Sequence, residues 1–180
     1  FPAMANSLMA FDALGYSSDH PDYIAARKAI DGLLVDNGDW GYCQPCLSPV
    51  WDTGLAAHAM LEADKASGPH AIEDDTIAKS CNWLEELQIK DCFGDWAIWR
   101  PGIRPGGWAF QYRNDYYPDI DDTAVVAMAL HRTGNKNYEP TIQRAAEWVV
   151  GMQSKSGGWA AFDADNEYHL LENMPYADHG

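Results

Sequence analysis

The stretch YYPDIDDTAVVAMALHR, Tyr116 to Arg132, places three aspartates within four residues directly before an apolar run. The run is apolar almost all round, which is typical of a helix enclosed in a protein core. Asp and Thr are common at helix N-termini because their side chains accept hydrogen bonds from free backbone N–H groups. Like charges this close also repel, so ionising one carboxyl disfavours ionising the next. The stretch predicts a buried helix. At its start Asp119, Asp121 and Asp122 either cap the helix and hold metal or water, or keep one carboxyl protonated.

The same pattern occurs once more upstream. WDTGLAAHAML, Trp51 to Leu61, matches the stretch from Asp121 to His131 at a spacing of 70 residues. The match aligns Asp52 with Asp122, and each is followed by Thr. A second buried helix is therefore expected here, and FPAMANSLMAFDALGY at the start of the chain reads as a third, ended by Gly15.

A second series of segments alternates with the first. Lys79 to Trp96 and Arg144 to Trp159 share a basic residue, Trp four places on, Gln five places after that, and a Gly turn closed by Trp. Corresponding residues lie 65 positions apart, and a looser copy ends at Trp40. Polar residues among apolar ones at helical spacing predict half-exposed helices.

The order is therefore inner helix, loop, outer helix and Gly-Trp turn, repeated, with weak strand signals. We expect an all-α fold of the α/α-toroid type, in which inner helices line a ring and outer helices surround it. A solenoid of helix pairs is the competing architecture, but periods of 65 to 70 residues are long for helical solenoids. In a toroid the inner helices would begin at one end, which would place Trp51 near the three aspartates.

The repeated aromatic and amide residues have a structural explanation. A Gln side chain at the end of an outer helix can bond free backbone groups, while an indole packs over the neighbouring helix end. Residues interpreted in this way are Trp83, Gln88, Trp96, Trp148, Gln153 and Trp159.

Composition excludes several functions. The 180 residues suffice for one ordinary domain. A formal net charge of -15, from 12 basic and 27 acidic residues, argues against nucleic-acid binding, which needs Lys and Arg. No apolar run approaches the ~18 residues of a membrane span. Because the chain opens on Phe1 and stops at Gly180 in mid-pattern, we expect a piece of a longer protein.

The four cysteines do not form a recognisable zinc or disulfide framework. Cys43 and Cys46 have C-x-x-C spacing, but no second pair follows at zinc-ribbon distance, and Cys81 and Cys92 stand apart. Buried or half-buried thiols are the expected state. Neither a metal site nor a cofactor is predicted.

These motifs together resemble the squalene–hopene cyclase family over essentially all 180 residues. Asp119 to Ala124 is similar to its D-x-D-D-T-A motif, and the Trp-Gln-Gly-Trp segments resemble the Q-W repeats of triterpene cyclases. SPVWDTGLA, GGWAFQY and GGWAAFDADN (from Ser48, Gly106 and Gly157) follow in the family's order. Oxidosqualene cyclases usually have a D-C-T-A-type sequence at the motif, so the resemblance implies squalene itself as substrate.

The resemblance implies a protonation-initiated isomerase. Members have two α-helical domains, one a double-ring α/α barrel, and residues 1–180 would be part of that single catalytic barrel domain. The enzyme would convert squalene to hopene, either alone or together with hopanol, in hopanoid biosynthesis. It would lie on the cytoplasmic face of the cell membrane as a peripheral, monotopic protein, as a monomer or a homodimer, without nucleic acid or cofactor.

The resemblance also assigns residues. Asp121 would be the proton donor, tuned by Asp119 and Asp122, and the family's partner histidine would fall beyond Gly180. Aromatic faces stabilise a migrating cation without attacking it. The cavity residues implied are Trp51, Phe110 and Phe162, with Trp108 as a weaker candidate. At the position of Phe162 many members have Tyr.

Three other functions stay open from the residues alone. The aspartates could merely cap a core helix in a non-catalytic helical interaction module. The acids and tryptophans also permit an α/α-toroid glycosidase with a carboxyl pair. An ionising terpene synthase or prenyltransferase would need metal ligands and a diphosphate pocket, against which the low Lys and Arg count argues.

Overall fold

The chain folds as two compact units, Phe1–Leu47 and Ser48–Gly180, in a computed structural model that describes residues 2–44, 46–68 and 74–165. Two residues of the predicted pattern, Phe1 at the first helix and Asn166 after the last turn, lie outside the described residues. Helices dominate both units, and among the described residues the one sheet is a two-stranded hairpin.

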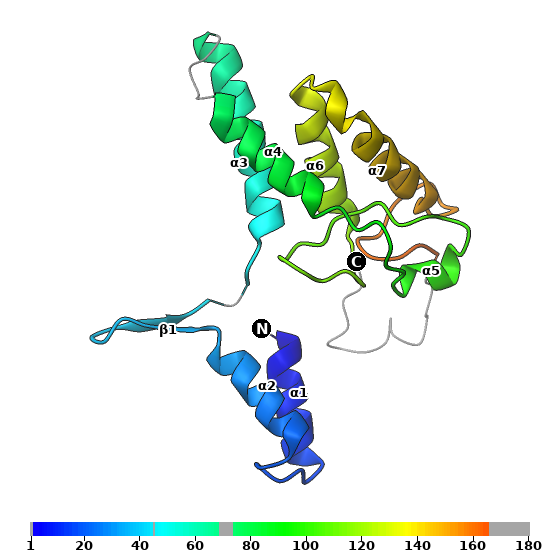
Figure 1. Ribbon diagram of the computed structural model, residues 1–180. Coiled ribbons are helices and arrows are strands. Elements are labelled where there is room, and N and C mark those ends of the chain that lie inside the picture. The colour runs from blue at the N-terminus through cyan, green and yellow to red at the C-terminus, as the bar shows by residue number, and fades with distance from the viewer. Residues whose placement is uncertain (1, 45, 69–73, 166–180) are drawn as a thin grey trace. The chain divides into compact units, whose positions relative to one another are not determined.

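The first unit contains α1 (Pro2–Ala13) and α2 (Pro21–Asp31), which pack side by side (Figure 1). Helix α1 ends two residues before Gly15, close to the predicted boundary. The prediction that this helix is buried is wrong for the described unit, because residues 4–13 are half-buried or exposed and Met9 is 68% exposed. Its packing partner is α2, and a single neighbour covers only one face of a helix.

A β-hairpin follows α2 where a looser helical repeat had been expected. Strands β1 (Leu34–Asp36) and β2 (Gly41–Cys43) pair antiparallel, with Leu34 opposite Cys43. Gly38 in the connecting turn has φ of +82°, and its N–H donates to Asp36 Oδ1. An Asn-Gly pair between residues of high strand propensity is a hairpin signal that the helical reading overlooked.

The second unit contains the predicted inner and outer helices. The inner helices are α3 (Pro49–Ser67) and α6 (Ile120–Arg132), and the outer helices are α4 (Asp74–Glu86) and α7 (Glu139–Gly151). Helix α6 packs against α3 and α7, and α4 packs against α3 (Figure 1). The remaining elements are the short helix α5 (Trp96–Trp99) and the 3₁₀ turn η1 (Lys136–Tyr138).

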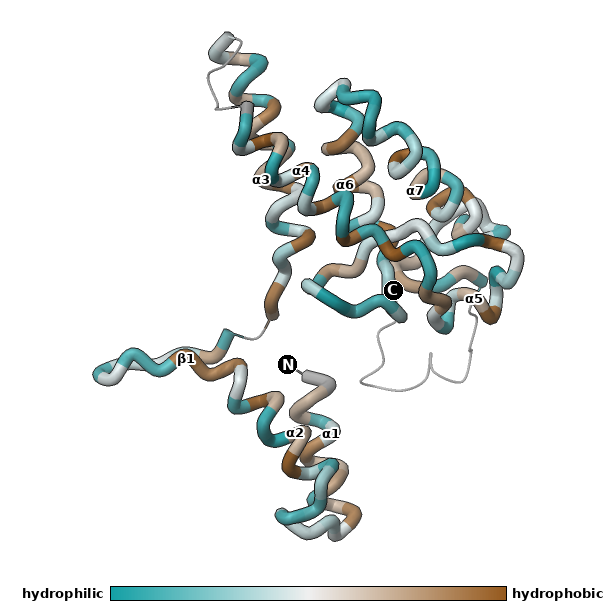
Figure 2. Tube along the Cα trace, viewed as in Figure 1, coloured by the Kyte–Doolittle hydropathy of each residue, from teal (hydrophilic) through white to brown (hydrophobic). Residues whose placement is uncertain are grey.

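The core of the second unit forms where these helices meet. Helix α6 contributes Val126, Ala129 and Leu130, all fully buried. Each outer helix buries one stripe, with Cys81 and Leu84 on α4 and Ala145 and Trp148 on α7. Hydrophilic and hydrophobic segments alternate along these helices (Figure 2). Fully burying a side chain such as that of Leu84 contributes roughly 1.5–3 kcal/mol, so the stripe stabilises a half-exposed helix.

The Gln-Trp repeats connect helices to the turns that follow them. Gln88 Nε2 donates to the carbonyls of Gly106 and Thr141, at 2.9 Å each. Gln153 Nε2 donates to Gly157 at 2.7 Å. In both copies the amide thus reaches the first residue of a Gly-Gly-Trp sequence, which supports the structural role predicted for both glutamines.

The indoles show that the first repeat is closed by a different tryptophan from the one predicted. Trp159 Nε1 donates to the carbonyl of Val149, four residues before Gln153. Trp108 Nε1 donates to the carbonyl of Leu84, four residues before Gln88. Trp108 is therefore the structural equivalent of Trp159, and Trp96 is not.

An insertion explains why sequence spacing misidentified this residue. Gln88 and Gly106 are 18 positions apart, whereas Gln153 and Gly157 are 4 apart. The extra residues form what we call the inserted segment (residues 89–105), which includes α5. A Gly-x-Trp sequence inside it, ending at Trp96, imitates the closing turn. Trp96 instead packs edge-on against Trp148, with ring centroids 5.8 Å apart.

Candidate active site at the start of helix α6

The first turn of α6 is fixed by hydrogen bonds that use the motif's own residues. Asp119 is the N-cap, and its Oδ1 accepts a bond from the Asp122 N–H at 2.8 Å. Thr123 Oγ1 donates to the carbonyl of Asp119 at 2.6 Å and accepts from the N–H of Trp108 at 3.0 Å. A Cβ on Gly107 would lie 2.8 Å from Thr123 Oγ1, so only glycine allows the preceding loop to come this close.

Two Gly-Gly-Trp turns meet this helix start. The first turn (residues 106–110) is joined by a bond from the Asp119 N–H to the carbonyl of Trp108, at 2.9 Å. The second turn (residues 157–162) is joined by a bond from the Ile120 N–H to the carbonyl of Ala161, also at 2.9 Å. Each turn ends in a phenylalanine, so the repeats bring Phe110 and Phe162 to the start of α6.

These residues line a partly open pocket of about 170 Å³. Acids at the start of α6 and aromatic side chains from three other segments line it. These segments are the first turn of α3, which carries Trp51, and the two Gly-Gly-Trp turns. The residues that line it are Trp51, Phe110, Asp119, Asp121, Asp122, Ala161 and Phe162. The structure therefore brings together six of the seven predicted site residues, while their roles in a reaction stay predictions.

The seventh residue, Trp108, is placed elsewhere. Its side chain is fully buried and its indole N–H donates to Leu84, so it faces the core and not the pocket. Proximity to the acids in sequence was a misleading signal, because Trp108 closes the first repeat. The residue that the sequence interpretation missed is Ala161, which directly precedes Phe162 and is one residue more than the first turn has at this place.

The three carboxyl groups occupy different environments. Asp122 is 1% exposed, and its Oδ1 has no hydrogen-bond partner among the described residues. The pKa of Asp122 is raised from 3.8 to about 8, chiefly by burial and, in the same direction, by the hydrogen bond with Asp119 and the charges of Asp119 and Asp121. Asp122 therefore holds a proton at neutral pH.

Asp121 differs from the expectation of a dry acid. Its side chain lines the pocket but is exposed to solvent in this chain, whereas the desolvated acid is Asp122. Helical geometry is the reason. Asp122 lies on the same face as the buried Val126 and Ala129, while Asp121 lies on the face of Met128, which is 54% exposed.

Helix capping explains only one of the three acids. Asp119 performs that role, which is typically worth about 0.5–2 kcal/mol. The corresponding Asp52 on α3 is exposed and accepts a bond from Ser48 Oγ at 2.7 Å. Neither arrangement accounts for a buried, protonated acid beside an exposed one in an aromatic pocket, so the site can do more than cap a helix.

Substituting Asp122 with Asn should change the pH dependence of stability. A carboxyl whose pKa is raised on folding stabilises the native state fully below its unfolded pKa. This stability is lost as pH rises from the unfolded pKa to the folded pKa, by at most ~1.4 kcal/mol per pH unit. Wild-type stability should therefore fall between about pH 4 and 8, and the Asn variant should lose that slope. Thermal unfolding of the full-length enzyme across this range measures it. Parallel pH profiles for the two proteins would contradict the assignment.

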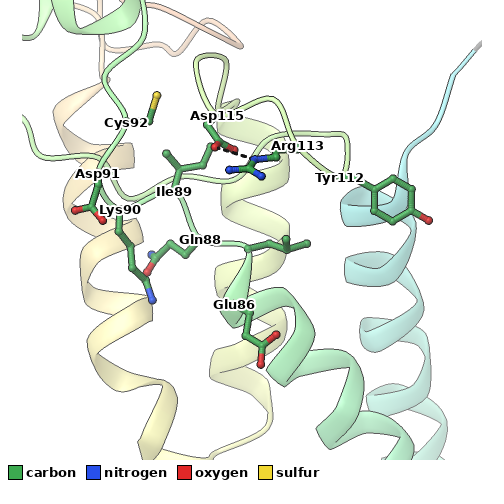
Figure 3. Close-up of a pocket in the computed structure, with 10 residues that line it drawn as sticks. Glu86, Gln88, Ile89, Lys90, Asp91, Cys92, Tyr112, Arg113 and Asp115 are labelled. Carbon is green, nitrogen blue, oxygen red and sulfur yellow. Dashed lines mark ion pairs between the residues drawn. The ribbon is translucent and has the colours of Figure 1, made fainter.

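A larger pocket of about 590 Å³ lies on a different part of the unit (Figure 3). Lys90, Asp91 and Cys92 reach it from the loop after α4, and Arg113 and Asp115, which form an ion pair at 3.6 Å, from the segment before α6. Charges of both signs line it, together with Tyr112. It contains none of the predicted site residues, and its polar lining does not suit a hydrocarbon.

No described cysteine lines the acid pocket at the start of α6. Cys43 and Cys46 are exposed, contrary to expectation, while Cys81 is buried and Cys92 half-buried. No group of three or more His, Cys, Asp or Glu residues suited to a metal occurs in the described part of the chain. Within the same residues, no helix has both the length and the apolar character needed to cross a membrane.

Comparison with known families gives matches along nearly the whole chain. The family model described as "Squalene-hopene cyclase C-terminal domain" matches residues 47–180, and that described as "Squalene-hopene cyclase N-terminal domain" matches residues 1–39. That residues 1–180 form part of a single barrel domain stays a prediction. The acid motif and both Gly-Gly-Trp turns fall in the C-terminal match.

Individual relatives agree with the family models. The chain is 54% identical to the squalene–hopene cyclase of Zymomonas mobilis, over all of the chain and 28% of that protein. It is 50% identical to the enzyme of Bradyrhizobium diazoefficiens, over all of the chain and 27% of that protein. With the enzyme of Alicyclobacillus acidocaldarius the identity is 41%, over 91% of the chain and 26% of that protein. The chain thus spans little more than a quarter of these relatives.

Proposed function

The chain belongs to the squalene–hopene cyclase family, and from this premise we propose that it is the acid-bearing part of an enzyme that cyclises squalene. The reaction begins when a carboxylic acid protonates a terminal carbon–carbon double bond. It ends when a proton is lost to give hopene, or water is added to give hopanol. Hopene has the atoms of squalene, so the enzyme is an isomerase.

The observation that carries the proposal is the pocket at the start of α6, in which three acids face three aromatic side chains. An alkene is a very weak base, so its acid must be protonated and shielded from bulk water. Carbocations in turn require neighbours that stabilise positive charge without bonding to it. In this pocket the buried, protonated Asp122 lies beside the exposed Asp121, and three aromatic side chains line the same space.

Asp121 is proposed as the proton donor. It lies between Asp119, whose Oδ1 is occupied by the helix cap, and Asp122, which holds its proton near neutral pH. A protonated neighbour adds no negative charge beside the donor. This assigns Asp122 the part of limiting the negative charge of the cluster while Asp121 acts as the acid.

Trp51, Phe110 and Phe162 are proposed to stabilise the cation as the rings close. A cation over an aromatic face gains roughly 0.5–2 kcal/mol, with the larger values in desolvated sites. Phe162 offers this face without a hydroxyl that could form hydrogen bonds. All three side chains line the same pocket as the acids, so the charge would meet them soon after protonation.

The pocket's size suggests which part of squalene it receives. At about 170 Å³ it is smaller than the ~300–1,000 Å³ typical of whole small-molecule sites. We therefore assign to this chain the end of squalene at which protonation begins. For the full-length enzyme we propose three further features. A partner histidine contacts the acid, the protein binds to the cytoplasmic membrane face as a monotopic protein, and it forms a homodimer.

Incubation of the full-length enzyme with squalene tests the proposal. Pentacyclic hydrocarbon should accumulate, detected by gas chromatography with mass spectrometry, in the presence of a metal chelator as in its absence. A parallel incubation with oligosaccharides examines the glycosidase alternative. Release of sugar with squalene unchanged would overturn the proposed function.

A further inference from the structure

The inserted segment bonds the first turn through the Ile89 N–H and the carbonyl of Gly107, and its later part packs against the second repeat. Trp96 meets Trp148 on α7 edge-on, at 5.8 Å between ring centroids. Ile103 packs directly against Gly151, so a side chain at position 151 would collide with Ile103. The segment thus crosses from the end of α4 to the end of α7, next to the second turn.

Arg100 is the polar centre of this contact. Its Nε donates to the carbonyl of Gly151 at 2.9 Å, and its Nη2 donates to the carbonyl of Gln153 at 2.9 Å. The same Nη2 forms an ion pair with Asp165 Oδ2 at 2.7 Å. The two side chains are 19% and 13% exposed, so the pair is shielded from solvent, and a bond this short is charge-assisted.

Asp165 is held in an unusual conformation by this network. Its φ of +54° is in the left-handed region, which non-glycine residues seldom adopt. Its Oδ1 accepts the N–H of Lys155 at 2.9 Å. The hydrogen bond from Arg100 is the largest influence that lowers the pKa of Asp165, followed by the N–H of Lys155. The group is therefore a carboxylate wherever the protein is folded at neutral pH.

The segment that carries Phe162 is consequently fixed on both sides. Before it, Ala161 accepts the N–H of Ile120 in the acid-bearing helix. After it, Ala164 is fully buried beside Trp96, Trp148 and Met152, and Asp165 is paired with Arg100. Phe162 itself is 52% exposed, so local burial does not determine where its ring lies.

We propose that Arg100 is a positioning residue for the cyclisation, which holds the Phe162 ring in the acid pocket by binding Asp165 and the end of α7. The inference rests on the proposed function, because it concerns an aromatic face of that site. It assigns the inserted segment, which belongs to the first repeat, a role beyond packing: the segment holds the turn of the second repeat in place.

The test compares single substitutions in the full-length enzyme incubated with squalene. Arg100→Gln and Asp165→Asn remove the pair. Arg104→Gln is the matched control, because Arg104 lies in the same inserted segment and forms an ion pair with Glu147 on α7, but does not contact the second turn. Phe162→Ala gives the reference pattern for a missing ring. The readouts are kcat, KM and the ratio of incompletely cyclised to pentacyclic product.

The pair variants should lower kcat on the order of ten- to a hundredfold, as expected when a reacting geometry is displaced by about an ångström. They should also shift the product ratio toward that of Phe162→Ala, while Arg104→Gln keeps the wild-type ratio. Arg100→Lys, which retains the charge, should restore part of the pentacyclic product and remains usable if Arg100→Gln does not fold.

Wild-type product ratios and kcat in folded Arg100→Gln or Asp165→Asn enzyme would overturn the inference while leaving the cyclase function intact. The same holds if Arg104→Gln shifts the products as strongly, because the effect would then be general destabilisation. A wild-type enzyme that forms no polycyclic product would overturn the proposed function, and the positioning role with it.

Discussion

Replacing Asp121 with Asn should reduce squalene cyclisation by the full-length enzyme on the order of 10²- to 10⁴-fold, the range that a general acid contributes. The amide is nearly the size of the carboxyl group and keeps an oxygen that can accept hydrogen bonds, so the helix start should be retained. What it lacks is an acidic proton for the alkene. The effect should appear in kcat more than in KM, because the side chain acts on the transition state.

Asp52 provides the control for this prediction. It lies at the start of α3, where it aligns with Asp122, the neighbour of Asp121; like Asp121 it is exposed, and it accepts a hydrogen bond from Ser48. Asp52→Asn should therefore leave turnover within about twofold, as surface substitutions away from a site usually do. Equal activity of the Asp121→Asn and wild-type enzymes, at equal amounts of folded protein, would remove the catalytic role from Asp121.

Replacing Trp108 with Ala should have the largest effect on stability, a loss of about 3–5 kcal/mol in the free energy of unfolding. The indole is fully buried, and its N–H bond to Leu84 ties the first turn to the end of α4. Its backbone also joins Asp119 and Thr123, so displacement of the turn would disturb the acid pocket as well.

Trp159→Ala is the matched comparison. Trp159 makes the equivalent bond to Val149, but its side chain is 47% exposed, so much less burial is lost. Thermal and urea unfolding of the two variants should place the midpoint of Trp108→Ala well below that of Trp159→Ala. Equal destabilisation would show that burial of the Trp108 side chain does not contribute more to stability than that of the exposed Trp159.

Much of the second unit could be predicted because each inner helix repeats a sequence pattern. Asp-Thr followed by apolar residues correctly marked α3 and α6, and the Trp and Gln spacing marked α4 and α7. The all-α character of the fold follows from the same pattern, and the toroid from membership of the family. These signals are local, so they survive without knowledge of tertiary contacts.

The errors occurred where local signals were ambiguous. The inserted segment carries Gly94-Asp95-Trp96, which satisfies the Gly-x-Trp pattern, while the true closing turn lies further on at Trp108. Only the hydrogen bonds of Gln88 and of the Trp108 indole distinguish the two. In the first unit the sequence suggested a helical repeat where Asn37 and Gly38 form a hairpin turn.

The candidate site was predictable in its membership but not in the state of each acid. Six of the seven residues meet in one pocket because two repeats and two inner helices converge on it. Which carboxyl is desolvated depends on which helix face points inward. The spacing of Asp122, Val126 and Ala129 contained that information, since these positions share a face, but the sequence interpretation considered the three acids as one cluster.

The most direct test of the central claim, that an acid of this pocket starts the reaction by protonating squalene, is to run the squalene incubation in deuterium oxide. The exchangeable proton of the acid is then a deuteron, so the pentacyclic product of the full-length enzyme should carry one deuterium, bonded to carbon in the first ring to form. Mass spectrometry of that product measures it. A pentacyclic product without carbon-bound deuterium would contradict protonation by an exchangeable carboxylic acid.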